Sequence, residues 1–139
     1  LSRGLGDVYK RQVFILLGVN MHESGEMYLE TIYVLSQKQQ NVRSIDVAEE
    51  MGFSKPSVSR GVSILKQQGY LTVDGNGFLE LTDSGMDLAK KIYERHTVLT
   101  EALVKLGVDP EIAQQDACKM EHIISDETLN AFKRHMGKD

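Results

Sequence analysis

Two short helical patterns separated by a tight turn lie between residues 44 and 69, and a hairpin pattern follows them directly. We expect Ser44 to cap the first helix and Gly52 to end it, because glycine readily adopts the left-handed conformation found at helix ends. The second helix carries Pro56 in its first turn, where a missing N–H does no harm, and runs to Gly69. Apolar residues fall on one face of each helix, at Ile45, Ala48, Met51, Val58, Val62 and Leu65. Two helices joined by a short turn that contains glycine are the helix-turn-helix pattern.

The residues after Gly69 predict a small β-hairpin. The β-prone runs YLTV and FLELT flank the sequence DGNG, whose glycine and asparagine residues tolerate positive φ angles. A hairpin that directly follows a helix-turn-helix is a candidate wing. We therefore predict a winged helix-turn-helix domain over residues 21–82.

The rest of the chain is expected to be helical. Candidate caps and the spacing of apolar residues predict four further helices, over about residues 24–39, 83–106, 110–124 and 126–136. Ser24 is a candidate N-cap for the first of them, and Leu106 is the last apolar residue of the long second one. Residues 83–139 therefore form a second, helical unit.

The first 20 residues are expected to be a non-native leader. Residues 1–12 look like the translation of a sequencing adaptor, and the protein is expected to start at Met21. The apolar run over residues 13–20 is too short to span a bilayer, so we expect no association with a membrane. The single cysteine, Cys118, excludes an internal disulfide and favours a reducing, cytoplasmic location.

The charges of the chain are unevenly distributed. The formal net charge of −4 argues against nucleic acid as a partner, but basic residues gather over residues 43–66 and acidic residues over residues 109–127. A recognition helix needs small and hydrogen-bonding side chains at its N-terminal end, so that the backbone can approach base edges. The candidates for DNA contact are Arg43, Ser54, Lys55, Pro56, Ser57, Ser59 and Arg60.

Among these candidates, Arg60 could pair with a guanine, and Lys55 and Arg43 could hold phosphates. The alternative is that these polar residues form only the solvated face of an amphipathic helix. The wing that follows this helix favours DNA.

The segment Cys118-Lys-Met-Glu121-His122 combines a thiol, a carboxylate and an imidazole. Spacings of three and four residues would place these groups on one face of a helix, where they could supply half of the shell of a divalent metal ion. Further ligands would have to come from elsewhere, and Met27, Glu30 and His96 are candidates. The alternative is a buried free cysteine beside a surface Glu–His pair.

Taken together, these residues resemble the diphtheria toxin repressor (DtxR) and manganese transport regulator (MntR) family of metal-dependent repressors. The resemblance covers about Glu26 to the C-terminus, through the segments EMYLETIYVL, SKPSVSR, YLTVDG, LTDSG, YERH and ACKMEHIISDE. It implies that Met27, Cys118, Glu121 and His122 ligate a metal, to which the manganese type adds Glu30 and His96. The implied fold is mostly α, with an N-terminal winged helix-turn-helix followed by a helical metal-binding and dimerisation domain.

The resemblance mixes two metal types, because Met27 and Cys118 match the iron type and Glu30 matches the manganese type. Soft sulfur donors favour iron over manganese, so we expect Fe(II), with Mn(II) next. The ancillary site of the iron type is expected not to be intact, since its positions hold Thr100 and Gln114, although Glu101 lies one residue away.

The expected function is that of a metal-dependent transcriptional repressor, not an enzyme, which binds palindromic double-stranded DNA as a homodimer and controls metal-homeostasis genes. A regulator that responds to a small organic ligand is the first alternative. A hydrolase that uses Cys118 and His122 is the second.

Overall fold

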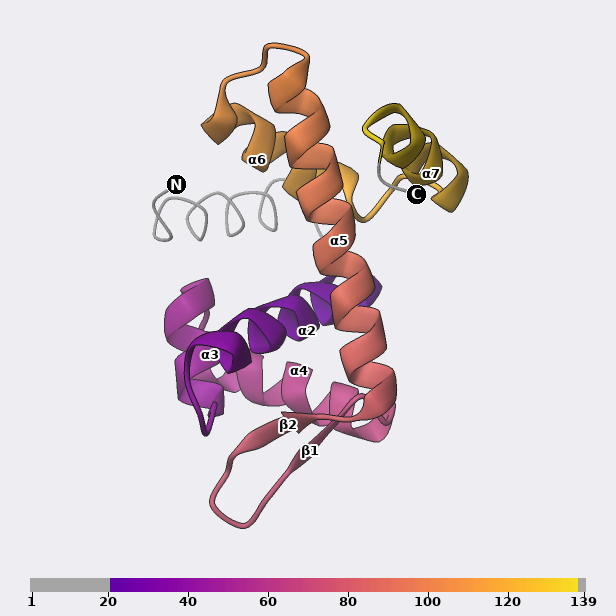
Figure 1. Ribbon diagram of the computed structural model, residues 1–139. Coiled ribbons are helices and arrows are strands. Elements are labelled where there is room, and N and C mark those ends of the chain that lie inside the picture. The colour runs from indigo at the N-terminus through magenta and orange to yellow at the C-terminus, as the bar shows by residue number, and fades with distance from the viewer. Residues whose placement is uncertain (1–20, 138–139) are drawn as a thin grey trace.

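The computed structural model describes residues 21–137, so the expected leader over residues 1–20 lies outside the described residues. Within the described range the chain is mostly helical, with one small two-stranded sheet (Figure 1). The elements in chain order are α2 (Met21–Lys38), α3 (Ser44–Met51), α4 (Lys55–Gln67), β1 (Leu71–Val73), β2 (Leu79–Leu81), α5 (Asp83–Lys105), α6 (Pro110–Met120) and α7 (Asp126–His135). None of these helices is long and apolar enough to cross a membrane.

The helix-turn-helix consists of α3 and α4, which pack against each other and against α2. Gly52 has a φ angle of 70° and bonds through its N–H to the carbonyl oxygen of Ala48, which confirms the predicted end of α3. Ser44, however, is the first residue of α3 and not its N-cap. The Asp46 carboxylate instead accepts a hydrogen bond from the backbone N–H of Arg43 at 2.8 Å.

Helix α2 crosses the helix-turn-helix and supplies the centre of its core (Figure 1). Its buried apolar side chains meet those of α3 and α4 in one cluster, which includes Met27, Tyr28, Leu29, Ile32, Leu35, Val47, Val58, Val62 and Leu65. Because α2 begins at Met21, Ser24 lies inside the helix and the predicted N-cap is wrong. Ile45, predicted to face the core, is 37% exposed.

The predicted hairpin is confirmed as the antiparallel pair β1–β2, with Leu71 opposite Leu81. The Asp74 carboxylate holds its turn by accepting hydrogen bonds from the N–H groups of Asn76 and Phe78, at 2.8 and 2.9 Å. The chain before α3 also joins the hairpin, since the N–H of Leu79 donates to the carbonyl oxygen of Val42 at 2.7 Å. The wing is therefore joined to the helix-turn-helix twice, by the chain after α4 and by this hydrogen bond to the segment before α3.

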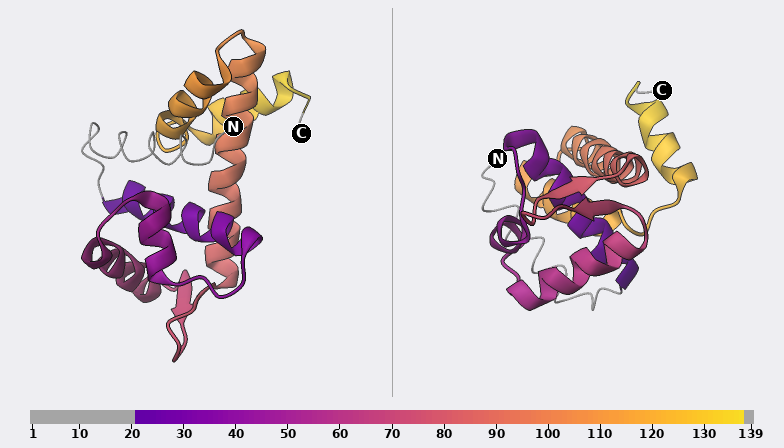
Figure 2. Two further views of the ribbon diagram at one scale, coloured as in Figure 1. Left: turned by 90° about the vertical axis from the view of Figure 1, so that its left-hand side faces the viewer. Right: turned by 90° about the horizontal axis from the view of Figure 1, so that it is seen from below.

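The long helix α5 runs from the wing to the far end of the molecule, where it packs against α6 and α7 (Figures 1 and 2). It also packs against α2, so it contacts both parts of the fold. Gly107, with a φ angle of 102°, follows the end of α5 as predicted. Leu106, expected on the apolar face of α5, is 73% exposed instead.

Candidate metal centre

Three side chains with ligating atoms converge where α5, α6 and the turn after α6 meet. One ligand atom each from His96, Cys118 and Glu121 lies within 4.8 Å of the other two. His96 Nδ1 is 3.0 Å from Glu121 Oε2 and 3.9 Å from Cys118 Sγ. Cys118 and Glu121 are buried. An imidazole, a thiol and a carboxylate at this distance form a donor set suited to a transition metal.

His122 joins this cluster from the turn after α6. Its Nε2 atom is buried, makes no hydrogen bond and lies 3.3 Å from Oε1 of Glu121. Its Nδ1 atom lies 2.9 Å from Oε1 of Glu26 on α2. A buried imidazole nitrogen without a hydrogen bond, beside a carboxylate, is suited to receive a cation.

Glu121 and His122 directly follow the last residue of α6, Met120. The helix ends at Met120 rather than near residue 124, but the C-cap Glu121 keeps a right-handed helical conformation and its N–H bonds to the carbonyl oxygen of Ala117, so Cys118 and Glu121 still lie one helical turn apart. Glu121 is the C-cap, and a turn follows in which the N–H of Ile123 bonds to the carbonyl oxygen of Met120 at 3.1 Å. Cys118 and Glu121 therefore converge at the i, i+3 spacing that the sequence indicates, and His96 joins them from α5.

Arg95 on α5 holds this turn in place. Its Nη1 atom donates to the carbonyl oxygens of Glu121 and Ile124, at 3.3 and 2.9 Å, and its Nη2 atom pairs with the Asp126 carboxylate at the start of α7. These bonds connect the residues after α6 and the start of α7 to α5.

Sequence reasoning missed both Arg95 and Glu26 as residues of this region. Their contacts join positions 29 and 96 residues apart, respectively, and such pairs leave no periodic pattern in one sequence. The one available signal is that each precedes a predicted ligand, His96 or Met27, by a single position.

The remaining predicted ligands, Met27 and Glu30, lie on α2, where both side chains are buried, with 2% and 1% of their surface exposed. Met27 is part of the apolar core. Neither belongs to the trio of ligating groups that converge between α5 and the end of α6. At the ancillary position, the hydroxyl of Thr100 donates to the carbonyl oxygen of His96 at 2.8 Å.

The two histidines of the cluster have raised pKa values. Burial lowers the pKa of His96, but hydrogen bonds and charges from Cys118 and Glu121 outweigh burial and raise it from 6.5 to about 10. Burial likewise lowers the pKa of His122, and the carboxylates of Glu121 and Glu26 raise it from 6.5 to about 9. Without a metal ion, therefore, protons compensate the negative charge of this cluster near pH 7.

Six of the seven predicted DNA-binding residues lie at and near the N-terminus of α4, and Arg43 is the N-cap of α3. Ser54 is the N-cap and accepts a hydrogen bond from the N–H of Ser57 at 3.3 Å. Arg60 Nη2 donates to the Ser57 hydroxyl oxygen at 3.4 Å. Ser57 is half-buried, and the other members of this set on α3, α4 and their caps are exposed, namely Arg43, Ser54, Lys55, Pro56, Ser59 and Arg60.

Arg43 connects this surface to the wing. Its guanidinium lies over the ring of Phe78, 4.7 Å from the ring centre, and its backbone pairs with that of Phe78 in a β-bridge. The exposed guanidinium is thus held at the base of the hairpin, between the helix-turn-helix and the wing.

Comparisons with known proteins match both halves of the chain. Residues 20–78 match the model of the iron dependent repressor N-terminal DNA binding domain, and residues 82–138 that of the iron dependent repressor metal binding and dimerisation domain. The transcriptional regulator MntR of Salmonella typhimurium is 38% identical over 145 residues, which cover 95% of this chain and 92% of that protein. The iron-dependent repressor IdeR of Mycobacterium tuberculosis is 35% identical over 106 residues, which cover 76% of this chain and 46% of that protein.

Solved structures show the same fold. The structure of the manganese regulator SloR superposes with a TM-score of 0.74 at 27% identity, covering 83% of this chain and 54% of that one. The X-ray crystal structure of the metal-dependent transcriptional regulator MtsR gives a TM-score of 0.77 at the same identity and coverage, 27%, 83% and 54%. This chain therefore spans about half the length of these two proteins and of IdeR.

Proposed function

The chain belongs to the iron-dependent repressor family, the DtxR and MntR group of metal-dependent transcriptional regulators. From this we propose that the cluster around Glu121 and the two candidate ligands on α2 form the regulatory metal site. The protein is a DNA-binding repressor of a family whose members sense iron or manganese. The proposed ligands are Met27, Glu30, His96, Cys118, Glu121 and His122.

The convergence of His96, Cys118 and Glu121 within 4.8 Å is the observation on which this proposal depends. His96 comes from α5, whereas Cys118 and Glu121 come from the end of α6, so the packing of these two helices brings the three groups together. The buried, unbonded Nε2 of His122 beside Glu121 adds a fourth donor. Nitrogen, sulfur and oxygen donors together fit a divalent transition metal better than magnesium or calcium.

Within this class we propose Fe(II) as the physiological metal, with Mn(II) as the second choice. The thiol of Cys118 and the thioether of Met27 are soft donors, which favour iron. Glu30 is the feature that favours manganese. Relatives named for iron and for manganese are both similar to this chain.

Metal control would act through α2, which packs against the long helix α5 and also against the recognition helix α4. A bound divalent cation supplies positive charge among the carboxylates and the thiol in place of the histidine protons. To hold the metal ion, the imidazoles of His96 and His122 would have to be neutral, so each would lose one proton. The position of α2 then sets that of α4. Metal can shift the equilibrium between the two conformations of the protein only by as much free energy as its affinities for these conformations differ.

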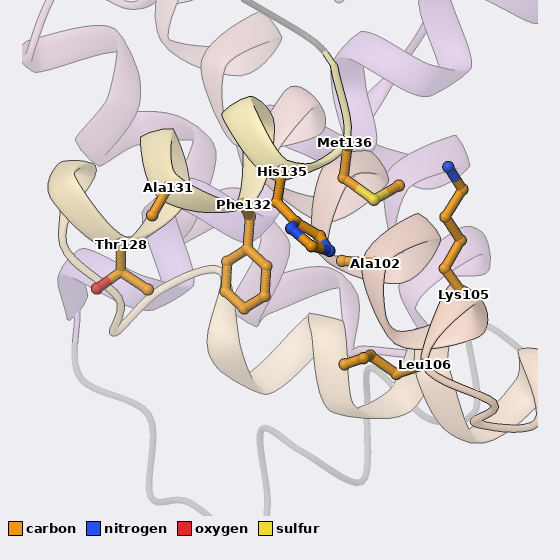
Figure 3. A pocket seen from close by; sticks show the side chains of 8 residues that line it. All are labelled: Ala102, Lys105, Leu106, Thr128, Ala131, Phe132, His135 and Met136. Atoms are coloured by element: carbon orange, nitrogen blue, oxygen red, sulfur yellow. The ribbon is translucent and has the colours of Figure 1, made fainter.

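We propose a homodimer that binds a palindromic operator in the cytoplasm. An exposed apolar groove of about 560 Å³ between α5 and α7 supports a second copy of this chain as its occupant (Figure 3). Leu106 and the ring of Phe132 line it (Figure 3). Residues 82–138, which include this groove, are the part that matches the dimerisation model. Two recognition helices related by a twofold axis would read the two halves of a palindrome.

The test is DNA binding by the full chain under anaerobic conditions. A palindromic duplex would first be selected from random double-stranded DNA in the presence of Mn(II), and fluorescence anisotropy would then be measured with chelator, Fe(II) or Mn(II). We expect at least a tenfold gain in affinity with metal, about 1.4 kcal/mol of coupling, and the stronger effect with Fe(II). Equal affinity with chelator would show that DNA binding is not controlled by metal.

The two alternatives make different predictions. If the protein responds to a small organic ligand, Glu121→Ala should leave the effect of metal on operator binding unchanged. A hydrolase would turn over an activated ester and lose this activity after Cys118→Ser. We expect neither result, because Cys118 Sγ, Glu121 and His96 lie within reach of one shared ion.

A further inference from the structure

His122 lies between two carboxylates that come from different parts of the fold. Its Nε2 atom faces Oε1 of Glu121 at 3.3 Å, inside the proposed metal site. Its Nδ1 atom faces Oε1 of Glu26 at 2.9 Å, outside that site and on α2. The two ring nitrogens therefore have separate neighbours, and only the second contact has hydrogen-bond geometry.

The contact with Glu26 is well shielded from water. The His122 side chain is 5% exposed and that of Glu26 is 17% exposed, so the hydrogen bond between them forms largely out of solvent. A charge-assisted hydrogen bond in such surroundings is stronger than one at the surface. It fixes the rotation of the imidazole ring and, once Nε2 has lost its proton, keeps the remaining proton on Nδ1.

We propose that Glu26 is a positioning residue of the metal site, which holds Nδ1 of His122 and so presents Nε2 to the metal ion. This inference depends on the proposed function and deepens it. A metal-binding histidine commonly donates its other N–H to a carboxylate, which orients the ring and makes the ligating nitrogen more basic. Here the carboxylate comes from α2, so the orientation of His122 depends on where α2 lies.

The same contact separates Glu26 from the metal ligands proposed above. Glu26 touches the nitrogen that points away from Glu121, whereas Glu121, His96 and Cys118 face one another. Its neighbour Met27 is the α2 side chain with a ligating sulfur. Glu26 thus acts through His122.

The test compares Co(II) binding by the full chain and by four variants under anaerobic conditions. Co(II) binding is followed by its d–d absorption and by the charge-transfer band of the Cys118 thiolate. Glu26→Leu removes the hydrogen bond, and Glu26→Gln keeps an oxygen that can accept it. Glu121→Gln changes a proposed ligand, and Glu94→Gln removes an equal charge from an exposed pair with Lys133.

We expect Glu26→Leu to raise the Co(II) dissociation constant about 10- to 100-fold and Glu26→Gln to raise it less. Glu94→Gln should stay within about twofold of the natural chain, since removal of an exposed charge has little effect. Loss of affinity in Glu121→Gln with unchanged affinity in Glu26→Leu and Glu26→Gln would overturn the inference and leave the metal site standing. Unchanged affinity in Glu121→Gln, or no Co(II) binding by the natural chain, would instead overturn the proposed function.

A second measurement separates orientation from general stability. In the Zn(II)-loaded protein, ¹H–¹⁵N correlation spectra of the histidine rings identify which nitrogen of His122 binds metal and which carries the proton. We expect metal on Nε2 and a strongly hydrogen-bonded proton on Nδ1, with the signal of that proton displaced in Glu26→Leu. Metal on Nδ1, or a proton signal that Glu26→Leu leaves in place, would show that Glu26 does not position His122.

Discussion

Tyr28 on α2 lies so close to Gly61 on α4 that no side chain fits between them. A Cβ atom built on Gly61 would be 2.4 Å from Cε2 of the Tyr28 ring. The same ring packs edge-on against Phe53, with 6.2 Å between ring centres. Since Tyr28 follows Glu26 and Met27 on α2, this contact connects the helix beside the metal site to the recognition helix.

The contact predicts that Gly61→Ala destabilises the protein. Overpacking a core costs about 1–3 kcal/mol, and better helix propensity returns about 1 kcal/mol, so we expect a net loss of up to about 2 kcal/mol. Gly25→Ala is the matched control, because its Cβ would make only an ordinary contact, 3.7 Å from Leu65 Cδ2. Urea unfolding should show Gly25→Ala equal to or more stable than the natural chain. Equal stability of the two variants would mean that Tyr28 moves freely.

The parts of the fold that depend on neighbouring residues could be predicted from the sequence. Gly52 ends α3 through its own conformation, and the DGNG turn closes the wing. The N-cap of α3 was misplaced by one residue, because the Asp46 carboxylate reaches the N–H of Arg43 and no serine cap is needed. Local chemistry thus placed α3 and the turn of the wing to within a residue or two.

Three of the six candidate ligands, His96, Cys118 and Glu121, lie together as the sequence suggested, but the contacts of Arg95 and Glu26 around them were not predicted. Cys118, Glu121 and His122 were expected on one helix, but α6 ends at Met120, and Arg95 donates to the carbonyl oxygens of Glu121 and Ile124 beyond that end. That bond depends on how α5 packs against α6, which the spacing of apolar residues does not specify. Leu106 was misplaced for a similar reason, since an apolar side chain predicts burial but does not name the surface that covers it.

Arg95 should be needed for the shape of the metal-binding turn. We expect Arg95→Met to lower the stability of the metal-free protein by about 1–3 kcal/mol, because it leaves hydrogen-bonded carbonyl oxygens without a donor. Its Co(II) affinity should fall at least tenfold, measured in the same titration as above. Lys91→Met is the control, since Lys91 also pairs with Asp126, at 3.7 Å, but both side chains are exposed. Similar losses in the two variants would assign the effect to Asp126 and not to the turn.

The raised pKa values of His96 and His122 predict opposite effects of pH on folding and on metal binding. Both pKa values rise on folding, from 6.5 to about 10 and about 9, so the stabilisation is complete below about pH 6.5 and is lost as the pH rises through 9 and 10. With chelator present, the melting temperature should fall by roughly 5 °C or more between pH 6.5 and 9. Metal affinity should rise over the same range, because ligating imidazoles must be neutral.

Calorimetry of the natural chain and of Glu121→Gln checks this prediction. Glu121 is among the groups that raise the pKa of both histidines, so its replacement should flatten the fall in melting temperature. A melting temperature that rises with pH in the natural chain would contradict the assigned protonation of the cluster.

The recognition helix predicts different roles for Arg60 and Lys55. Both side chains are exposed on α4, and Arg60 is aligned by its hydrogen bond to the Ser57 hydroxyl. We expect Arg60→Ala to cost about 1–3 kcal/mol at the operator and to relax specificity at one base pair. Lys55→Ala should weaken binding to all sequences alike and lower the number of counterions released on binding by about one. Anisotropy titrations over a range of salt and single-base operator variants would distinguish the two, and identical profiles would contradict this division.

Leu106 predicts where two copies of the chain meet. It is 73% exposed at the end of α5 and lines the apolar groove with Phe132 and Met136 of the α7 region (Figure 3). A carboxylate placed there would be buried without a partner in the dimer, so Leu106→Glu should weaken dimerisation at least tenfold, about 1.4 kcal/mol. Sedimentation equilibrium without DNA measures this, with Ile45→Glu as a control for the same change on the 37% exposed Ile45 of α3. If Leu106→Glu dimerises like the natural chain while Ile45→Glu does not, the dimer forms through the helix-turn-helix surface, and the spacing of the two recognition helices must be derived from that contact.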